Sequence, residues 1–268
     1  MELNRKISIM GIVNLTDDSY FAESRCANVQ AAIDRIAGLV AEGADIIDIG
    51  ACSTRPGSLP VGAEEEWRRL EPVLAAFRSN FQNVTLSIDT YWASVVEKAF
   101  GLLDSFIVND ISAGEADPDM LPTVGRLGLK YVAMHMRGTP ENMQQLTDYK
   151  DVVEDVLDYF KKFSKKAEIH GISDWILDPG FGFAKTLEQN YALMRGLEKI
   201  KSEMSPRPIL VGLSRKSMIY RFLGITPEES LPATQALHMA ALERGADILR
   251  VHDVAEAVRT VSLFKMLS

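Results

Sequence analysis

A carboxylate that is followed by a rigid, glycine-rich turn is the most informative local feature of this sequence. Residues 178–183 read DPGFGF, and they follow directly on the short apolar run Trp175–Leu177. Proline restricts the backbone after the carboxylate, and the two glycines allow the backbone to come close to a bound molecule. The segment therefore predicts that a buried strand presents Asp178 to a ligand at its end.

The same arrangement recurs along the chain, because each of eight short apolar runs contains or leads into polar side chains. The runs are 7–15, 46–50, 84–90, 105–111, 130–136, 175–178, 209–214 and 248–253. Their polar side chains include Asn14, Arg55, Asp89, Asn109, Asp110, His135, Asp178, Lys216, Arg250 and His252. Carboxylates and amides can recognise the N–H edge of a planar heterocycle, and arginine can stack on a ring face. These residues predict a site for a heterocycle that carries an anionic group.

The runs also predict the fold that positions these side chains. Runs rich in Val, Ile and Leu suit a parallel sheet that is covered on both faces, and the intervals between them are long enough for helices. Amphipathic patterns occupy 29–42, 64–77, 152–169, 229–245 and 254–267. We expect a single domain over residues 1–268, an α/β protein with a (β/α)8 TIM barrel, whose functional residues gather at the C-terminal ends of the strands. An open doubly wound sheet is the alternative.

Composition limits the class of protein further. The chain has a net charge of -8, which argues against nucleic acid as a partner, and its 47% hydrophobic residues are enough for a large core. No run of apolar residues is long enough to span a membrane, and the N-terminus lacks the pattern of a signal peptide. With only Cys26 and Cys52, we expect a cytoplasmic protein without disulfides. Met120, Met239 and Met266 fall on apolar helix faces, and we expect them in the core.

Structural roles for the same polar residues remain open at this stage. An aspartate at a strand end is often a helix cap or a turn former, and Asn109 with Asp110 could serve as turn residues. His135 lies between two methionines and fits a satisfied buried histidine better than a ligand. We find no zinc-ligand spacing, no nucleophile elbow and no phosphate-binding lysine loop. The residues alone predict a barrel enzyme that acts on an anionic heterocycle.

Eight motifs, one for each expected strand, carry a resemblance to a known family. They are residues 10–20 (MGIVNLTDDSY), 53–57 (STRPG), 87–90 (SIDT), 109–111 (NDI), 134–136 (MHM), 178–183 (DPGFGF), 214–217 (SRKS) and 250–253 (RVHD). In this order they resemble the dihydropteroate synthases, which are pterin-binding TIM barrels. The resemblance implies a reaction that joins p-aminobenzoate to 6-hydroxymethyl-7,8-dihydropterin pyrophosphate in folate synthesis. It also implies Mg²⁺, a homodimer, and an SN1-like mechanism in which pyrophosphate leaves before the aryl amine attacks.

The resemblance also implies a role for each matching residue. The expected pterin contacts are Asp89, Asn109, Asp178 and Lys216, with Ile111 and Met134 lining the pocket and Arg250 stacking on the ring. Arg250, His252 and Asn14 would surround the pyrophosphate, and Asn14 would bind Mg²⁺. The expected p-aminobenzoate side comprises Thr54, Arg55, Pro56, Phe183, Lys216 and Ser217. The catalytic residues would be Asp89, Lys216, Arg250 and His252.

The sequence departs from the family pattern in two expected loops. Asp17 stands where the family has proline, Tyr20 where it has phenylalanine, and Ala51–Cys52 where it commonly has Gly-Glu. Two other functions therefore stay open. One is a methyltetrahydrofolate:corrinoid methyltransferase, which shares the barrel but needs no pyrophosphate site. The other is a pterin-binding relative that lacks catalysis. The motifs at 53–57 and 214–217 favour the synthase.

Overall fold

Parallel strand pairing brings the ends of all the expected strands to one side of the molecule. The computed structural model describes residues 5–15, 25–52 and 61–267, with the backbone alone for 25–28. Within these ranges the strands are β1 (Ser8–Asn14), β2 (Ile46–Gly50), β3 (Thr85–Asp89), β4 (Ile107–Asp110), β5 (Lys130–Met134), β6 (Trp175–Asp178), β7 (Leu210–Val211) and β8 (Ile248–Val251). β7 is shorter than the apolar run 209–214, because the chain already turns at Leu213, whose carbonyl accepts a hydrogen bond from the amide of Lys216 at 3.1 Å.

The eight strands form one sheet, which closes on itself. The strand order is β6-β5-β4-β3-β2-β1-β8-β7, and every pairing is parallel. A parallel bridge between Leu177 and Ile209 joins the two ends of this order, and the amide of Leu177 donates to the carbonyl of Pro208 at 3.0 Å. The (β/α)8 barrel expected from the sequence is therefore confirmed, and the open doubly wound sheet is excluded.

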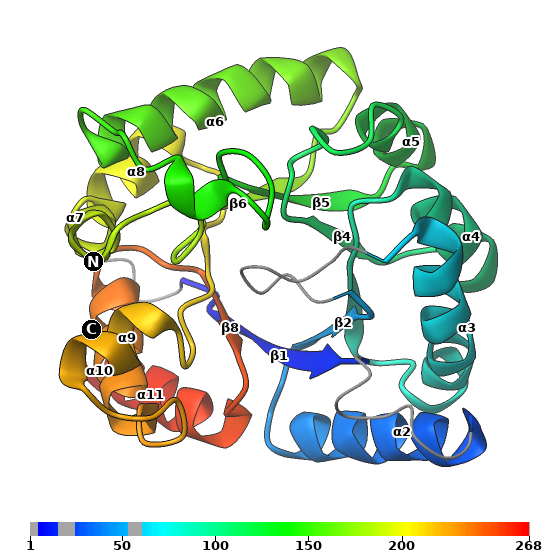
Figure 1. Cartoon of the computed structure of the whole chain (residues 1–268). Coiled ribbons are helices and arrows are strands. Elements are labelled where there is room, and N and C mark those ends of the chain that lie inside the picture. The colour runs from blue at the N-terminus through cyan, green and yellow to red at the C-terminus, as the bar shows by residue number, and fades with distance from the viewer. Residues whose placement is uncertain (1–4, 16–24, 53–60, 268) are drawn as a thin grey trace.

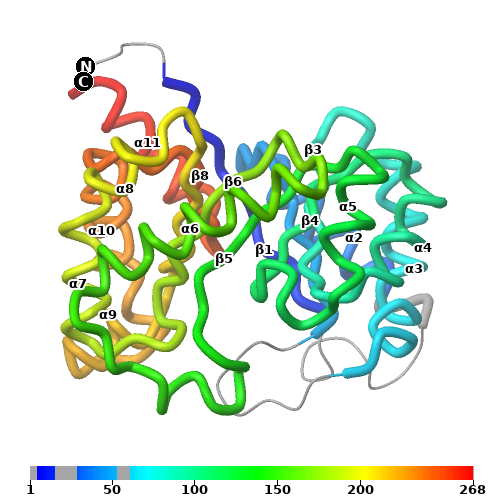
Figure 2. The backbone as a smooth tube through the Cα atoms, turned by 90° about the horizontal axis from the view of Figure 1, so that it is seen from above, coloured from blue at the N-terminus to red at the C-terminus, as the bar shows by residue number. Residues whose placement is uncertain are grey.

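Helices form the outer layer around the strands (Figures 1 and 2). They are α2 (Arg25–Ala41), α3 (Ala63–Asn80), α4 (Ala93–Leu103), α5 (Met120–Leu127), α6 (Val152–Ile169), α7 (Leu187–Arg195), α8 (Leu197–Met204), α9 (Ser217–Leu223), α10 (Leu231–Glu243) and α11 (Val254–Leu267), with a short 3-10 helix, η1 (Met143–Gln145). Local sequence sets several starts: Asp151 caps α6, and Thr186 with Gln189 forms a capping box on α7.

Two apolar layers hold the barrel together. Side chains that point outward from the strands pack under the helices, and Trp175, Tyr131 and Phe160 are among the largest that are fully buried. Inward-pointing side chains fill the barrel itself with a second cluster: Met10, Ile46, Ile107, Val132, Ile176, Leu210 and Ile248. Such a filled interior closes the barrel below the strand ends, so a ligand can enter only above this layer.

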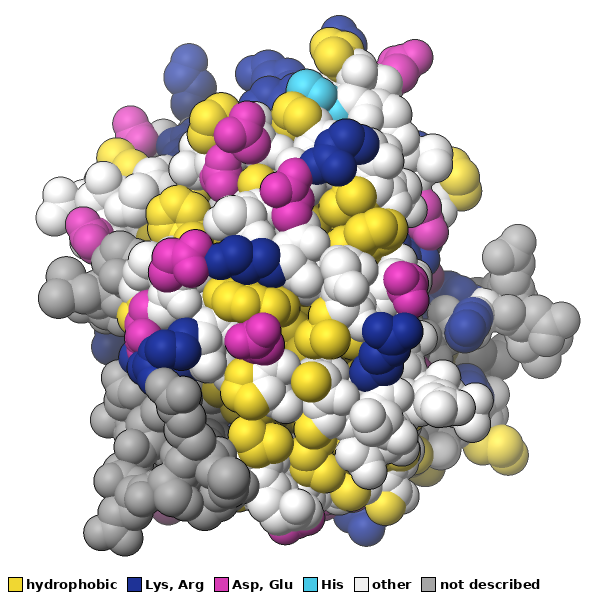
Figure 3. Space-filling view, turned by 90° about the vertical axis from the view of Figure 1, so that its right-hand side faces the viewer, with side chains coloured by type: hydrophobic (Ala, Val, Ile, Leu, Met, Phe, Trp, Pro, Cys, Tyr) yellow, Lys and Arg dark blue, Asp and Glu magenta, His cyan; other side chains and the backbone are white. Residues whose placement is uncertain are grey.

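The exterior carries charges of both signs. On the face formed by α3, α4 and α5, basic and acidic side chains alternate (Figure 3), and ion pairs such as Lys98–Glu64 and Arg126–Glu97 join neighbouring helices. Of the methionines expected in the core, Met120 is fully buried and Met239 packs against the core. The expectation for Met266 is wrong: the last turn of α11 leaves this side chain 85% exposed. Across the described residues, no helix is both long and apolar enough to cross a membrane.

Candidate active site

A polar layer lies directly above the apolar filling of the barrel. Side chains two residues apart on a strand point to the same side, so each residue two places after a member of the filling also faces inward. These positions hold Ile12, Asp48, Asn109, Met134, Asp178, Gly212 and Arg250. On β2, β4, β6 and β8 the inward-facing side chain thus changes from apolar to polar within one strand period. These polar side chains form the floor of the site.

Asp48 is the centre of this layer, although its role was not expected from the sequence. Its side chain is fully buried and accepts hydrogen bonds from Ser87 Oγ at 2.5 Å and from Asn109 Nδ2 at 3.1 Å. Arg250 Nε donates to the same carboxylate at 2.7 Å. One carboxylate on β2 therefore fixes side chains from β3, β4 and β8.

Asp89, at the end of β3, shares the Arg250 guanidinium with Asp48. Arg250 Nη2 lies 2.6 Å from Asp89 Oδ2 and also 2.6 Å from Asp48 Oδ2. Burial raises the pKa of Asp89, while Arg250 opposes that rise and Asp48 adds to it. The guanidinium is therefore held by two carboxylates, from β2 and β3.

Asp178 and Lys216 lie on the opposite side of the barrel from β2. The amide of Gly180 donates to Asp178 Oδ1 at 2.8 Å, and Lys216 donates to the carbonyl of Phe181. Burial lowers the pKa of Lys216 to about 8, and the negative charge of Asp178 opposes that change. A Cβ on Gly212 would lie 4.0 Å from Asp178 Oδ2 and 3.8 Å from Arg250 Cβ, so glycine keeps the space between these two side chains open.

Lys185 holds the glycine-rich turn in place, and it was also missed. Its buried ammonium group contacts the carbonyl of Gly180 at 2.9 Å, the carbonyl of Phe183 at 3.0 Å and His135 Nδ1 at 3.0 Å. Gly180 has a φ of 70°, and a Cβ there would lie 2.0 Å from the carbonyl oxygen of His135, so only glycine fits. His135 is 2% exposed, which confirms the expectation of a buried, satisfied histidine.

An apolar wall faces the polar residues. Ile111, Met134, Met136, Met143 and Ala184 form a small buried cluster above the filled barrel, and Phe183 packs against it. The Lys216 ammonium lies 4.4 Å from the centre of the Phe183 ring. A flat ring bound here would meet apolar side chains on one side and Arg250 on the other. Ser217 begins α9, directly after Lys216.

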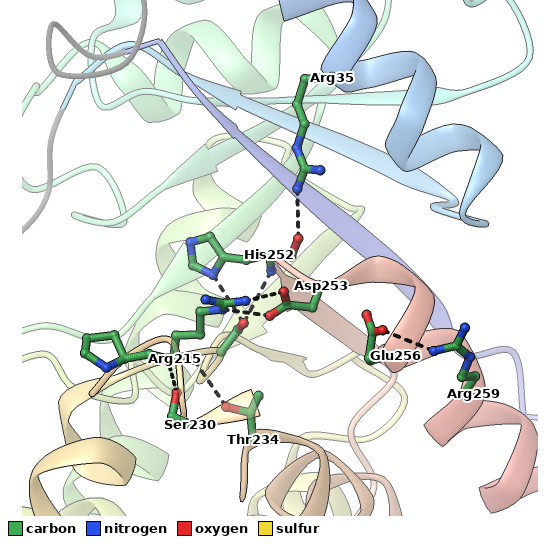
Figure 4. Close-up of polar contacts among 10 residues, drawn as sticks. Arg35, Arg215, Ser230, Thr234, His252, Asp253, Glu256 and Arg259 are labelled. Carbon is green, nitrogen blue, oxygen red and sulfur yellow. Dashed lines mark hydrogen bonds and ion pairs between the residues drawn. The ribbon is translucent and has the colours of Figure 1, made fainter. Parts of the chain in front are cut away.

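Cationic side chains surround the end of β8. Figure 4 shows His252, Arg215 and Asp253 pointing toward one another, with Arg35 reaching in from α2. The amide of His252 donates to Ser214 Oγ at 3.3 Å, and Ser214 Oγ lies 3.2 Å from His252 Nδ1, so the serine hydroxyl can donate to that nitrogen. This arrangement favours the tautomer with its proton on Nε2. Burial and the nearby charge of Arg250 lower the pKa of His252 to about 4, so the imidazole is neutral near neutral pH.

Arg215 and Asp253 tie the loops after β7 and β8 together. Arg215 Nε lies 2.8 Å from Asp253 Oδ2 and Nη2 lies 2.6 Å from Oδ1, a bidentate pair. Arg215 has a φ of 54°, a left-handed conformation that costs free energy in a residue with a side chain. Because Lys216 and His252 are the chain neighbours of this pair, we infer that it fixes the separation of these two side chains.

If this pair fixes the loops, Arg215 and Asp253 should be energetically coupled. In a double-mutant cycle of Arg215→Gln and Asp253→Asn, the coupling in the free energy of unfolding should be about 1–2 kcal/mol. The exposed pair Arg259–Glu256, 3.1 Å apart and visible in Figure 4, is the matched control, with an expected coupling of roughly 0–0.5 kcal/mol. Equal couplings for the two pairs would contradict the inference.

Asn14 ends β1 at the same side of the barrel and is exposed. In the described part of the chain, no three His, Cys, Asp or Glu residues lie together as ligands for a metal ion. A single amide oxygen suits a hydrated Mg²⁺ that takes its remaining ligands from a bound diphosphate. Thr54, Arg55 and Pro56 lie outside the described residues, as do the departures at Asp17 and Tyr20.

The structure thus brings the expected residues of β3 to β8 to one end of the barrel. Asp110 differs from its neighbours: its carboxylate accepts from Tyr131 Oη at 2.6 Å and from the amides of Ser112 and Gly114, so it stabilises the turn after β4. Of the residues that were missed, Asp48 left the clearest signal, a lone charge inside an otherwise apolar strand. Lys185 left none. Arg215 and Asp253 lie in the motifs at 214–217 and 250–253, but nothing in the sequence indicated their pairing, because the tertiary fold sets it.

These features define a class of protein: a parallel barrel whose strand ends form a narrow site with polar residues on its floor, an apolar wall and cations at one side. The model of the pterin binding enzyme family matches residues 10–252. The chain belongs to this family.

Individual relatives agree with the family match. The dihydropteroate synthase of Neisseria meningitidis serogroup C is 41% identical, over 98% of this chain and 93% of that protein. The mitochondrial folate synthesis bifunctional protein of Pisum sativum is 40% identical over 98% of this chain but only 54% of that protein, so the chain spans about half the length of this relative. A solved structure of Xanthomonas albilineans dihydropteroate synthase with 4-aminobenzoic acid superposes with a TM-score of 0.88 at 35% identity, over 98% of this chain and 93% of that chain.

Proposed function

We propose that the protein is a dihydropteroate synthase, a transferase that joins 6-hydroxymethyl-7,8-dihydropterin pyrophosphate to p-aminobenzoate and releases pyrophosphate. The observation that carries this proposal is the inward layer of Asp48, Asn109, Asp178 and Arg250 beneath an apolar wall. Relatives that carry the name dihydropteroate synthase align over nearly their whole length. The product, 7,8-dihydropteroate, would belong to folate synthesis.

The pterin would lie above Asp48, between Asp178 and Arg250. Asp178 keeps one oxygen on the amide of Gly180 and offers the other toward the gap that Gly212 leaves open. Two adjacent N–H groups of a pterin match such an acceptor, and Lys216 can donate to the ring oxygen. Arg250, held by two carboxylates, would present the flat face of its guanidinium to the ring.

Charge in the site suits a reaction in which the leaving group departs first. Asp89 and Asp178 place negative charge beside the ring, where positive charge would develop on the pterin methyl group. His252, neutral and with its proton on Nε2, would donate to the departing pyrophosphate, while Arg250 would contribute charge there. Lys216, Phe183 and Ser217 would border the p-aminobenzoate whose amine then attacks. Thr54, Arg55 and Pro56 would complete that side of the site.

Mg²⁺ is the cofactor that this chemistry requires. Asn14 would hold it at the end of β1, together with the phosphates of the substrate. When bound, the ion would stabilise the charge that accumulates on the leaving pyrophosphate. Among the described residues no three His, Cys, Asp or Glu side chains are grouped to hold a metal by themselves, which fits an ion that arrives with the diphosphate.

The cluster of cations distinguishes this reaction from methyl transfer. A methyltetrahydrofolate:corrinoid methyltransferase needs a pterin pocket but no site for pyrophosphate. In this chain Arg35, Arg215 and Arg250 gather with the neutral His252 at the end of β8. Asp253 pairs with Arg215, and Asp48 and Asp89 pair with Arg250. A cationic environment of this kind has a use if the substrate carries phosphates. It favours the synthase over the methyltransferase and over a pterin-binding protein without catalysis.

The proposal predicts pyrophosphate release that depends on both substrates and on Mg²⁺. Pterin pyrophosphate, p-aminobenzoate and Mg²⁺ together should give continuous release, and chelation of the ion should lower the rate by about a hundredfold or more. His252→Ala should slow release strongly and leave the affinity for 6-hydroxymethylpterin, which lacks pyrophosphate, nearly unchanged. Methylation of a corrinoid by methyltetrahydrofolate, without any pyrophosphate release, would instead establish the alternative.

We further propose that the protein acts as a homodimer in the cytoplasm. Exposed apolar side chains occur on α9 and α11: Phe222 is 61% exposed, Leu263 61% and Met266 85%. Solvent exposure of such side chains is unfavourable, and a second copy of the chain could cover them. Light scattering coupled to size-exclusion chromatography measures the oligomeric state, and Leu263→Lys should favour the monomer.

The low cysteine content supports the proposed location in the cytoplasm, which is a reducing compartment.

A further inference from the structure

Glu66 is a buried carboxyl group that no role described above uses. It lies in the first turn of α3 and is 0% exposed. Neither of its carboxyl oxygens has a hydrogen-bond partner in the part of the chain that the structure describes. The other carboxyl groups buried in the barrel differ from it: Asp48 accepts from three side chains, Asp110 from a tyrosine and two amides, and Asp178 from an amide.

An unpartnered carboxylate is costly inside a protein, whereas the protonated acid is tolerated. The titratable groups whose charges act on Glu66 are Asp89 and Tyr91 at and after the end of β3, Cys52 after β2, and Arg69 on α3. Arg69 donates to Glu65 at 2.7 Å and to the carbonyl of Ala51 at 3.4 Å. Burial, with a smaller contribution from Asp89, raises the pKa of Glu66 to about 8 against the opposing effects of the Thr90 hydroxyl and Arg69.

The charges around Asp89 explain why the protonation of Glu66 matters. Asp48 and Asp89 already place two negative charges against one Arg250 guanidinium. A third carboxylate nearby would raise the pKa of Asp89, because the effect of each charge on the other is reciprocal. Asp89 would then take up a proton and lose its capacity as an acceptor for ring N–H groups.

We propose that Glu66 is a positioning residue for Asp89: it stays protonated within the protein, so that Asp89 alone of the two carries negative charge at the pterin site. The role at the site rests on the proposed function, since Asp89 must contact a pterin for it to matter. The protonation of Glu66 does not depend on that function and can be tested separately.

Glu66→Gln is the decisive variant, because glutamine has nearly the same shape and can never ionise. Glu64→Gln is the matched control: Glu64 lies in the same helical turn, is exposed, and pairs with Lys98 at 2.7 Å. The dissociation constant for 6-hydroxymethylpterin is measured by calorimetry across the pH range for the wild type and for both variants. The wild-type dissociation constant is divided by that of Glu66→Gln. The effects of ionising Lys216 and the ligand, which both proteins share, cancel in this ratio.

This ratio should be near one at neutral pH and rise to about tenfold by about pH 9, because ionised Glu66 then disfavours charge on Asp89. The ratio of wild type to Glu64→Gln should stay near one throughout. If wild type and Glu66→Gln both bind the pterin tightly and the ratio of their dissociation constants does not change with pH, the proposal is overturned. If Glu66→Gln does not fold, Glu66→Leu removes the carboxyl group without adding a donor, and the same two outcomes apply.

A stability measurement keeps the proposal separate from pterin binding. A carboxyl group whose pKa is raised in the folded state stabilises the protein below its unfolded pKa, and this contribution is lost as pH rises toward the folded value. The melting temperature of Glu66→Gln relative to wild type should therefore increase between about pH 5 and about pH 8. If the wild type binds no pterin, the proposed function fails while this result can still hold. A constant difference in melting temperature would show that Glu66 is not held protonated.

Discussion

Asp178→Asn is expected to weaken the binding of 6-hydroxymethylpterin by about 2–4 kcal/mol, or roughly 30- to 1,000-fold. The amide of Gly180 can still donate to the remaining carbonyl oxygen, so the turn after β6 should keep its form. The new NH₂ group, however, would face the N–H groups of the pterin, and neither side could accept a hydrogen bond. Calorimetry measures the affinity, and urea unfolding should give a stability close to that of the wild type.

Asp174, just before the strand that ends in Asp178, is a suitable control. Asp174 precedes β6 at the opposite end of the barrel, where it is exposed and pairs with Lys130 at 3.2 Å. Asp174→Asn should leave the affinity for the pterin unchanged. If Asp178→Asn also binds the pterin as the wild type does, Asp178 does not recognise the ring.

Asp48→Asn is expected to lower both stability and turnover. Asparagine would direct its NH₂ group toward Arg250 Nε or Asn109 Nδ2, both of which now donate to the carboxylate. Loss of charge from a fully buried ion pair should cost about 2–4 kcal/mol in the free energy of unfolding. Arg250 would keep only Asp89, and its altered position should slow turnover by roughly a hundredfold.

The effect on turnover must be separated from the loss of folded protein. Rates are therefore measured at a temperature where Asp48→Asn is fully folded. Asp45→Asn is the control, because Asp45 lies at the opposite end of β2 and accepts from the amide of Ile9 at 2.8 Å. It should lose stability without a large change in turnover. A turnover of Asp48→Asn within about twofold of the wild type would mean that Asp48 only stabilises the barrel.

The contrast between Asp178 and Asp48 shows what the sequence could predict. Asp178 ends its strand and is followed by proline and glycine, so both its exposure to a ligand and its turn are visible in the order of residues. Asp48 lies in the middle of β2, and only the strand period relative to Ile46 places it inside the barrel. That inference needs the orientation of the strand, which an apolar run without clear alternation does not provide.

Contacts between distant loops could not be predicted at all. Arg215 and Asp253 are 38 residues apart, and Lys185 meets His135 across 50 residues. Their pairing depends on the closure of the barrel and on backbone conformations such as the positive φ of Arg215. Met266 failed as a core residue for a related reason: periodicity predicts a helix face but not whether the final turn still lies over the barrel.

The most direct test of dihydropteroate synthase activity measures both products of one reaction. The purified protein is mixed with pterin pyrophosphate, p-aminobenzoate and Mg²⁺, and 7,8-dihydropteroate and pyrophosphate are quantified in the same samples over time. We expect the two to form in equal amounts, and both to form roughly 30- to 1,000-fold more slowly with Asp178→Asn at substrate concentrations below saturation. Pyrophosphate without dihydropteroate, or a pterin complex that forms neither product, would contradict the proposed function.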